Sequence, residues 1–553
     1  MGLVKLFASL RNVSVPSSLA RYSPLNQVEA NDGLGYSDSE KLPIQPRSWT
    51  SRFFHVLNTL LPSFLQRDAV HSQKAAYPTS WLDGLRGFAA LFVFFCHLTF
   101  SYLDKVRFVY GTQLPAGSIM GNGQFIHAGD PLPGPVAIHS NGDPAQNNWF
   151  IQLPGVRLLF YGHPMVAIFF VVSGYALSAK PIRLVRRGVA AQGQLLQTLA
   201  SATFRRPARL LLPCIVSTLF IVVATRLGVY DYANRVATGE KVFRSNFRGW
   251  AWEPPPHVFK TLYAQLKDWK HETYGMMNFF THYHWAKSSY DNHLWTIPVE
   301  FRCSLFLFLT LAGTALLRPR MRLSLVCIFI ILSYTWGDIW EMGLFWTGMF
   351  LCELDFISAE KTSSMARPGI LSGNGSVIQQ LRKLKLRWVL VVMLSLYLLS
   401  YPEVYPELSN LYYYLSKIHY PGLRDSEQFR VPQCVGAALL VLAVSRCQMF
   451  KSFFSSSLAR YLGRISYALY LVHGPIIRSL GFSLSHVIFL RLNGGDKDIT
   501  ALSSGWYLFG AVVSNLTLIP VVIWAADLFN RAVDEPIVKL AKWIEGLVVE
   551  KAA

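Results

Sequence analysis

Ten long apolar runs, separated by polar segments, constrain this chain more than any other feature. A hydrocarbon core of about 30 Å requires about 20 apolar residues of helix, and each run is close to that length or exceeds it. Backbone polar groups in lipid must be paired within the chain, so such runs become helices. We therefore predict an all-α polytopic membrane protein with about ten transmembrane helices. The expected spans cover residues 84–103, 163–179, 207–228, 293–316, 321–336, 338–357, 387–402, 431–447, 459–480 and 506–530.

Basic residues give the chain a net charge of +20, and most of them lie between the apolar runs. In a soluble protein this charge would suggest nucleic-acid binding, but here it reports membrane orientation. The segment from Lys180 to Arg206 carries six basic residues and no acidic one, so it should face the cytosol. Both termini are then cytosolic. We expect a multi-pass protein of the endoplasmic reticulum, Golgi or plasma membrane, with the lipid bilayer and not nucleic acid as a partner.

Composition divides the chain into three parts. Residues 1–78 are rich in Ser, Pro and charge, which predicts a mostly disordered cytosolic tail with an interfacial helix at 51–67 that Pro62 would interrupt. Residues 79–536 form the membrane domain, and 537–553 a cytosolic C-terminal tail. The seven cysteines lie in or beside apolar runs, so we expect buried thiols and neither disulfides nor a zinc site.

Two ionisable residues interrupt the first apolar run, "WLDGLRGFAALFVFFCHL" at 81–98. Arg86 and His97 are eleven positions apart, which is ~16 Å of rise and ~20° of rotation, so they share one helix face at different depths. Ionisable residues within membrane segments are candidate functional residues. Alternatively, Arg86 pairs with Asp83 and His97 is an interfacial histidine. We favour function, with Arg86 at an entry point and His97 at a deeper reaction point.

A second charge within a span is Glu300, in "NHLWTIPVEFRCSLFLFL" at 292–309. His293 lies seven positions earlier on the same face, so a carboxylate could orient an imidazole there. A structural ion pair between Glu300 and Arg302 or a lysine is the alternative. In the ninth span, Tyr470 and His473 share a face and are candidates to line a cavity or to form hydrogen bonds in the core.

The stretch "FRRPARLLLP" at 204–213 places Arg205, Arg206 and Arg209 at the cytosolic mouth of the third span, with Pro207 starting the helix. Guanidinium groups can bind phosphates with two hydrogen bonds each. Arginines that only anchor the topology would produce the same pattern.

Together these stretches resemble the acyltransferase-3 family of integral membrane O-acyltransferases. The resemblance runs from about residue 80 to 536, and six motifs occur in the family's order. They are "LDGLRGFAALFVFFCH", "FFVVSGYALS" (169–178), "RRPARLLLP", "HLWTIPVEF" (293–301), "LGRISYALYLVHGP" (462–475) and "DEP" (534–536). The family's Arg-x10-His pattern maps onto Arg86 and His97, and its Arg-Arg-x-x-Arg pattern onto Arg205, Arg206 and Arg209.

The resemblance implies transfer of an acyl group, most commonly acetyl, from cytosolic acyl-CoA to a hydroxyl of a glycan, a lipid or a small molecule. The arginines would bind the donor, and His97 would be the base or a transient acyl carrier, supported by Glu300. Ser173, His293, Tyr470 and His473 are the candidate cavity residues. We expect acyl-CoA as a co-substrate, with no permanently bound cofactor and no metal.

Two other functions fit the same residues. A proton-coupled or small-molecule transporter also needs buried charges, although the halves of the chain show no convincing repeat. A non-catalytic scaffold would not need Arg86, His97 and Glu300. The loop at 229–292, with "GWAWEPPPH", is rich in aromatic residues and histidine, which suits either a sugar acceptor or an interfacial belt.

Overall fold

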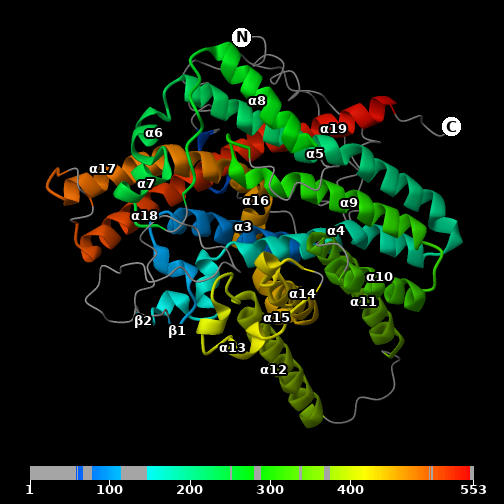
Figure 1. Ribbon diagram of the computed structural model, residues 1–553. Helices are drawn as coiled ribbons and strands as arrows, with labels where there is room; N and C mark the ends of the chain where they lie inside the picture. The colour runs from blue at the N-terminus through cyan, green and yellow to red at the C-terminus, as the bar shows by residue number, and fades with distance from the viewer. Residues whose placement is uncertain are drawn as a thin grey trace.

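The computed structural model describes residues 58, 60–66, 77–113, 146–249, 252–278, 288–335, 339–365, 374–421, 423–496, 499 and 502–548. Most of the predicted N-terminal tail and the first part of the predicted helix at 51–67 lie outside these residues. Figure 1 shows long helices that dominate the molecule, with α3, α4, α9 and α16 at its centre. The helices are α3 Ser80–Phe100, α4 His163–Arg186, α5 Gln192–Arg226, α6 Asp231–Ala237, α7 Glu240–Asn246, α8 Leu262–Met277, α9 Thr296–Gly313, α10 Pro319–Thr335, α11 Trp340–Met365, α12 Asn374–Leu399, α13 Tyr413–Ser416, α14 Arg430–Arg446, α15 Gln448–Phe454, α16 Ser457–Ile476, α17 Phe482–Leu492, α18 Ser504–Phe529 and α19 Glu535–Val548.

Short helical turns join several of these helices. Two are π-helical turns, η10 (Ile477–Gly481) after α16 and η12 (Asn530–Asp534) after α18. The 3-10 turns are η1 Ser63–Leu65, η3 Asp104–Arg107, η4 Phe150–Gln152, η5 Val156–Phe160, η6 Val189–Ala191, η7 Asn292–Trp295, η8 Pro406–Leu408 and η9 Asp425–Glu427. Two strands of two residues each, β1 (Thr112–Gln113) and β2 (Gln146–Asn147), pair antiparallel and are a small addition to the helical fold.

Each of the ten predicted spans coincides with a helix, so the predicted multi-pass helical fold is confirmed. Eight helical segments in the described residues are long and apolar enough to cross a membrane. The other two predicted spans correspond to α10, which has 17 residues, and to the apolar part of α12, Leu386–Leu399. Serine caps start two of the membrane helices, since the side chains of Ser456 and Ser503 accept hydrogen bonds from the backbone of α16 and α18.

The start predicted for the third membrane helix is wrong. Pro207 does not start this helix, because α5 begins fifteen positions earlier and contains Pro207 and Pro213 in its interior. Leu195 and Leu199 form an apolar stripe on the added segment and are buried in the main core, which compensates for the backbone hydrogen bond that Pro207 cannot make.

Glycines allow the central helices to approach each other closely. A Cβ atom on Gly87 of α3 would lie 2.4 Å from the backbone nitrogen of Gly463 in α16. A Cβ atom on Gly174 of α4 would lie 2.1 Å from the carbonyl oxygen of Phe345 in α11. Membrane helices pack through such small residues because backbone contact replaces the missing hydrophobic driving force.

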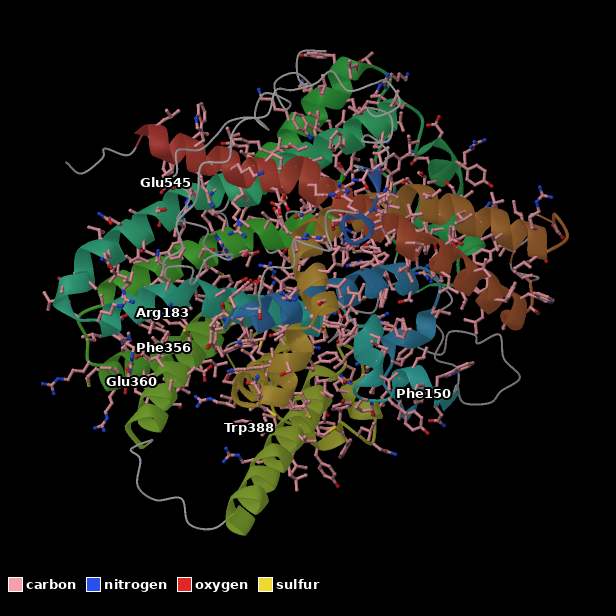
Figure 2. All side chains as sticks on the ribbon, turned by 180° about the vertical axis from the view of Figure 1, so that it is seen from behind. Phe150, Arg183, Phe356, Glu360, Trp388 and Glu545 are labelled. Carbon is pink, nitrogen blue, oxygen red and sulfur yellow. The ribbon has the colours of Figure 1, made fainter. Side chains whose placement is uncertain are left out.

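Both ends of the described chain pack on the membrane domain. Ser63 donates hydrogen bonds from its backbone and its hydroxyl to Asp527 of α18. At the other end, the described part of the predicted C-terminal tail lies in α19, where Glu545 is 3.1 Å from Arg205 of α5. Figure 2 labels Glu545 near the end of α19. All seven cysteines are free thiols. Five are buried, as the sequence predicts, whereas Cys96 is half-buried and Cys327 is exposed.

Candidate active site

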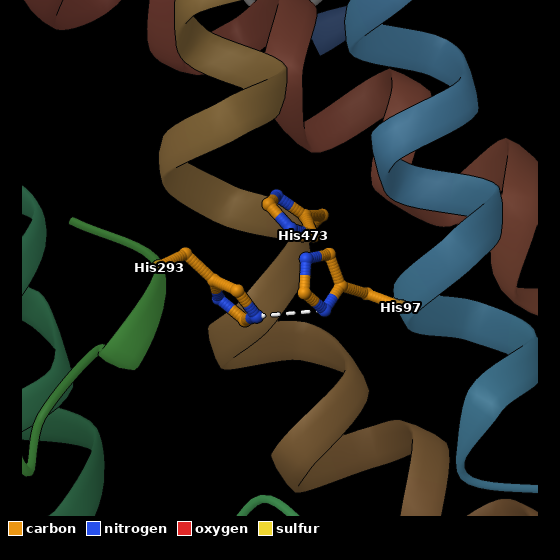
Figure 3. Close-up of side chains that lie close together, drawn as sticks. All are labelled: His97, His293 and His473. Atoms are coloured by element: carbon orange, nitrogen blue, oxygen red, sulfur yellow. Dashed lines mark hydrogen bonds between the residues drawn. The ribbon is translucent and has the colours of Figure 1, made fainter. Parts of the chain in front are cut away.

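Three histidines from distant parts of the sequence meet inside the helix bundle (Figure 3). His97 comes from the last turn of α3, His293 from η7 just before α9, and His473 from the last turn of α16. His97 Nδ1 and His293 Nε2 are 3.0 Å apart, and one ring nitrogen from each of the three side chains lies within 4.8 Å of the others. The sequence names all three as candidates but does not show that they share one site.

Two carboxylates hold these imidazoles, and the sequence analysis selects neither. Glu253 Oε1 is 2.9 Å from His293 Nε2 and 3.3 Å from His97 Nδ1. Asp291 Oδ1 is 2.8 Å from His293 Nδ1, and its side chain also caps η7 by accepting from the backbone of His293. An acidic residue two positions before a histidine is the sequence signal for Asp291. Glu253 has no comparable signal.

The electrostatics keep both carboxylates ionised. Burial alone raises the pKa of a carboxyl group, but the neighbouring His293 and His97 outweigh it and hold the pKa of Glu253 well below its ordinary value. Burial also tends to raise the pKa of Asp291, but His293 and Arg478 outweigh this effect, so the pKa of Asp291 lies below its ordinary value. The imidazoles therefore lie between fixed negative charges.

His473 has a defined tautomer. Its Nδ1 is 2.9 Å from the backbone oxygen of Leu469, and because a carbonyl only accepts, Nδ1 carries the proton. Nε2 is then an unprotonated acceptor. It is buried and has no hydrogen-bond partner among the described residues.

The backbone around the histidines is shaped to receive them. A Cβ atom on Gly474 would lie 2.3 Å from His293 Nδ1, so only glycine leaves room for this imidazole. Arg478, in the π-helical turn η10, donates to the backbone oxygens of Pro254 and Tyr290 and so fixes the segments that carry Glu253 and Asp291. Tyr470 donates to the backbone oxygen of His293, which ties α16 to η7. Tyr470 therefore lies beside the histidines and makes hydrogen bonds there, the alternative that the sequence leaves open.

Arg86 and His97 face the same helix, which confirms that they share one face of α3. Arg86 Nε is 3.1 Å from Ser466 Oγ and its Nη2 is 3.1 Å from the backbone oxygen of Gly463, both in α16. The ring of His97 lies 5.2 Å from that of His473, also in α16. Arg86 additionally pairs with Asp83 at 3.4 Å, the contact considered as the alternative.

We predict that Glu300 supports His97, but the described contacts of Glu300 are with other residues. Glu300 instead forms an ion pair with Arg206 at 2.8 Å, and Ser173 donates to the same carboxylate at 3.5 Å. Glu300 lies two helical turns after His293, so sharing a face with it does not bring the two side chains into contact. Glu253 contacts His97 and His293, and Asp291 contacts His293. Ser173 contacts Glu300.

The three arginines of "RRPAR" have different surroundings. Arg206 forms an ion pair with Glu300 and donates a hydrogen bond to Ser304. Arg205 forms an ion pair with Glu545. Arg209 lies within electrostatic range of Arg86, Arg206 and Asp534. Among the residues that the structure describes, it makes no hydrogen bond or ion pair.

Comparisons with known proteins show which family the chain belongs to. The acyltransferase domain family matches residues 79–524. The O-acetyltransferase PaAT-1 of Phomopsis amygdali is 30% identical over 497 residues, which cover 88% of each chain. The acyltransferases clz18 of Cochliobolus lunatus and R4 of Phoma sp. are each 25% identical over 83% of this chain and 94% of their own. No solved structure shows a significant match. The chain is an O-acyltransferase and belongs to the acyltransferase-3 family of integral membrane O-acyltransferases.

Proposed function

We propose that this protein transfers an acyl group, most often acetyl, from cytosolic acyl-CoA to a hydroxyl of a glycan, a lipid or a small molecule. The name of the Phomopsis amygdali relative supports acetyl as the transferred group. The enzyme would act in the endomembrane system or the plasma membrane, with acyl-CoA as a co-substrate rather than a resident cofactor. The acceptor enters from the side of the membrane opposite the basic segment.

The contact between Glu253 and His97 carries the proposal. Glu253 stays ionised, so its carboxylate accepts a hydrogen bond from the Nδ1–H group of His97, and the lone pair of this neutral ring is then on Nε2. Nε2 makes no hydrogen bond within the described part of the chain. A neutral imidazole in this tautomer is suited to act as a general base.

The reaction follows from this geometry. The acceptor oxygen attacks the thioester carbonyl carbon while His97 Nε2 takes the hydroxyl proton. The tetrahedral intermediate then collapses, the carbon–sulfur bond breaks, and His97 returns the proton to the coenzyme A thiolate. Each proton and each bond is accounted for, and no covalent acyl-enzyme is required.

The arginines are assigned to the donor. Arg209 has a guanidinium that the described residues leave without a hydrogen bond, and Arg86 lies within electrostatic range of it. Arg86 is ~16 Å of helix rise from His97, so it cannot share the reacting proton. A donor with its phosphates near these arginines and its thioester near His97 would span that distance with its pantetheine arm. Arg205 and Arg206 already have acidic partners and hold the helices around the donor.

Substitution of His97 tests the proposal. Membranes with wild-type or His97→Ala protein are incubated with radiolabelled acetyl-CoA and an extract of glycans, lipids and metabolites from the source organism. Loss of a general base should lower labelled ester formation by about 10²- to 10⁴-fold, while binding of acyl-CoA to the purified protein is retained. His486→Gln, in a buried histidine of α17, is the matched control and should keep both properties. Full transfer by a well-expressed His97→Ala protein would refute the assignment of His97 as the base. Failure of the wild-type protein to bind acyl-CoA would refute acyl-CoA as the donor.

A further inference from the structure

Two of the three histidines, His293 and His473, share a feature that acid–base catalysis does not require. In each of His293 and His473, Nδ1 donates to a fixed acceptor, and the other nitrogen of His293, Nε2, lies 3.0 Å from His97 Nδ1 and 2.9 Å from Glu253 Oε1. His293 donates from Nδ1 to Asp291, and His473 donates from Nδ1 to the backbone oxygen of Leu469. Metal-ligating histidines are oriented in this way, by a carboxylate or a carbonyl on the nitrogen that does not bind the metal.

The distances between the ring nitrogens and the carboxylate oxygen that face one another also suit a small cation. His97 Nδ1, His293 Nε2 and Glu253 Oε1 form a triangle with edges of 3.0, 2.9 and 3.3 Å. Ligands at about 2.0–2.1 Å from a tetrahedral Zn²⁺ are separated by similar distances. His473 Nε2 is available as a further ligand, because it is buried and has no hydrogen-bond partner among the described residues.

We propose that His97, His293 and His473 form a binding site for Zn²⁺, with Glu253 beside it, and that Zn²⁺ bound there inhibits acyl transfer. The inhibition rests on the proposed function, while the binding does not. Imidazole nitrogen favours Zn²⁺ over Mg²⁺ and Ca²⁺, which prefer oxygen ligands. The three histidines come from separate elements, α3, η7 and α16, so a short sequence motif cannot identify the site.

Inhibition follows from either mode of coordination by His97. If Zn²⁺ binds Nε2, it occupies the lone pair that accepts the hydroxyl proton. If it binds Nδ1, the proton of the neutral ring must sit on Nε2, which then cannot act as a base. Both modes remove the base without changing the fold.

Direct binding tests the site independently of activity. Purified full-length protein is stripped of metal with a chelator and titrated with ZnSO₄ by calorimetry, and with CoCl₂ while visible absorption is recorded. We expect one Zn²⁺ per chain and Co²⁺ bands typical of low coordination number. Asp291→Asn should weaken Zn²⁺ binding by about 10- to 100-fold, the usual effect of losing an outer partner of a ligating histidine. His473→Gln should weaken it further, and His486→Gln should not change it.

The outcomes separate the two proposals. Absence of Zn²⁺ binding, or binding of equal affinity in His473→Gln protein that unfolds at the wild-type temperature, overturns the site and leaves the proposed function intact. Zn²⁺ binding by protein that transfers no acyl group either with or without metal supports the site and overturns the proposed function. Transfer that is lost on chelation and restored by Zn²⁺ overturns the inhibitory role, because the metal is then required.

Discussion

At the scale of single residues, the protonation of the three histidines depends on which carboxylates contact their imidazole rings. Glu253 and Asp291 contact them, whereas Glu300 is paired with Arg206. A carboxylate on Nδ1 of a catalytic histidine fixes the tautomer and stabilises the imidazolium that forms during proton transfer. Glu253 is therefore a positioning residue in the proposed reaction.

Glu253→Gln should lower kcat by about 10²- to 10⁴-fold with little change in the KM for acyl-CoA, because the tautomer of His97 is no longer fixed. Steady-state kinetics with the labelled donor measure both constants. The pKa of Glu253 lies below its ordinary value of 4.5, so the carboxylate stabilises the fold above that pH and loses this effect as the pH falls through its lowered pKa. The difference in Tm between wild type and Glu253→Gln should therefore be largest near neutral pH and become smaller below pH 4.5.

A matched control is Glu240→Gln, which removes a carboxylate that is paired with Arg244 within α7. It should leave kcat unchanged. Equal kcat in wild type and Glu253→Gln would show that His97 does not need this carboxylate.

At the scale of elements, glycine contacts set the distance between the helices that carry the site. Gly87 and Gly463 bring α3 against α16, and the same approach lets Arg86 reach the carbonyl of Gly463. The packing of α3 on α16 and the contacts of Arg86, the residue proposed to bind the donor, therefore depend on the same helix crossing.

Gly87→Ala should push α3 away from α16, because its methyl group would lie 2.4 Å from backbone nitrogen that cannot rotate aside. Overpacking of this kind costs about 1–3 kcal/mol. We expect a lower Tm in detergent and weaker acyl-CoA binding, measured by thermal unfolding and by equilibrium binding.

Gly275→Ala, in α8, is the control because nothing lies within 4 Å of the added methyl group. It should keep donor binding and leave the stability unchanged or raised by about 0.4–1 kcal/mol. If Gly87→Ala behaves like Gly275→Ala, the close contact does not position Arg86.

At the scale of the whole molecule, the arginines and the histidines occupy two depths along α3 and α16. Arg86 lies in the first half of α3 and His97 in its last turn. The proposed reaction needs the donor to arrive at the arginine end from the cytosol. Membrane orientation therefore decides whether the chemistry can work as described.

Labelling of introduced, exposed cysteines measures this orientation. In a Cys327→Ser background, Leu196→Cys and Tyr414→Cys introduce thiols at exposed positions on α5 and α13. In sealed microsomes with the cytosolic face outward, a membrane-impermeant maleimide should label Leu196→Cys directly and Tyr414→Cys only after detergent is added. The reverse pattern would contradict the prediction of cytosolic termini and the donor route.

The sequence by itself determines the helical membrane fold, the positions of its ten apolar segments and the shared face of Arg86 and His97. These properties depend on local hydropathy and on helical periodicity, which neighbouring residues specify. The tertiary structure decides which charges meet. Glu253 reaches His97 across 156 positions, and Arg206 reaches Glu300 across 94, so no local pattern can select Glu253 over Glu300. Ion-pair partners in a helix bundle are chosen by the packing of whole helices, and only the folded chain brings three histidines and two carboxylates to one point.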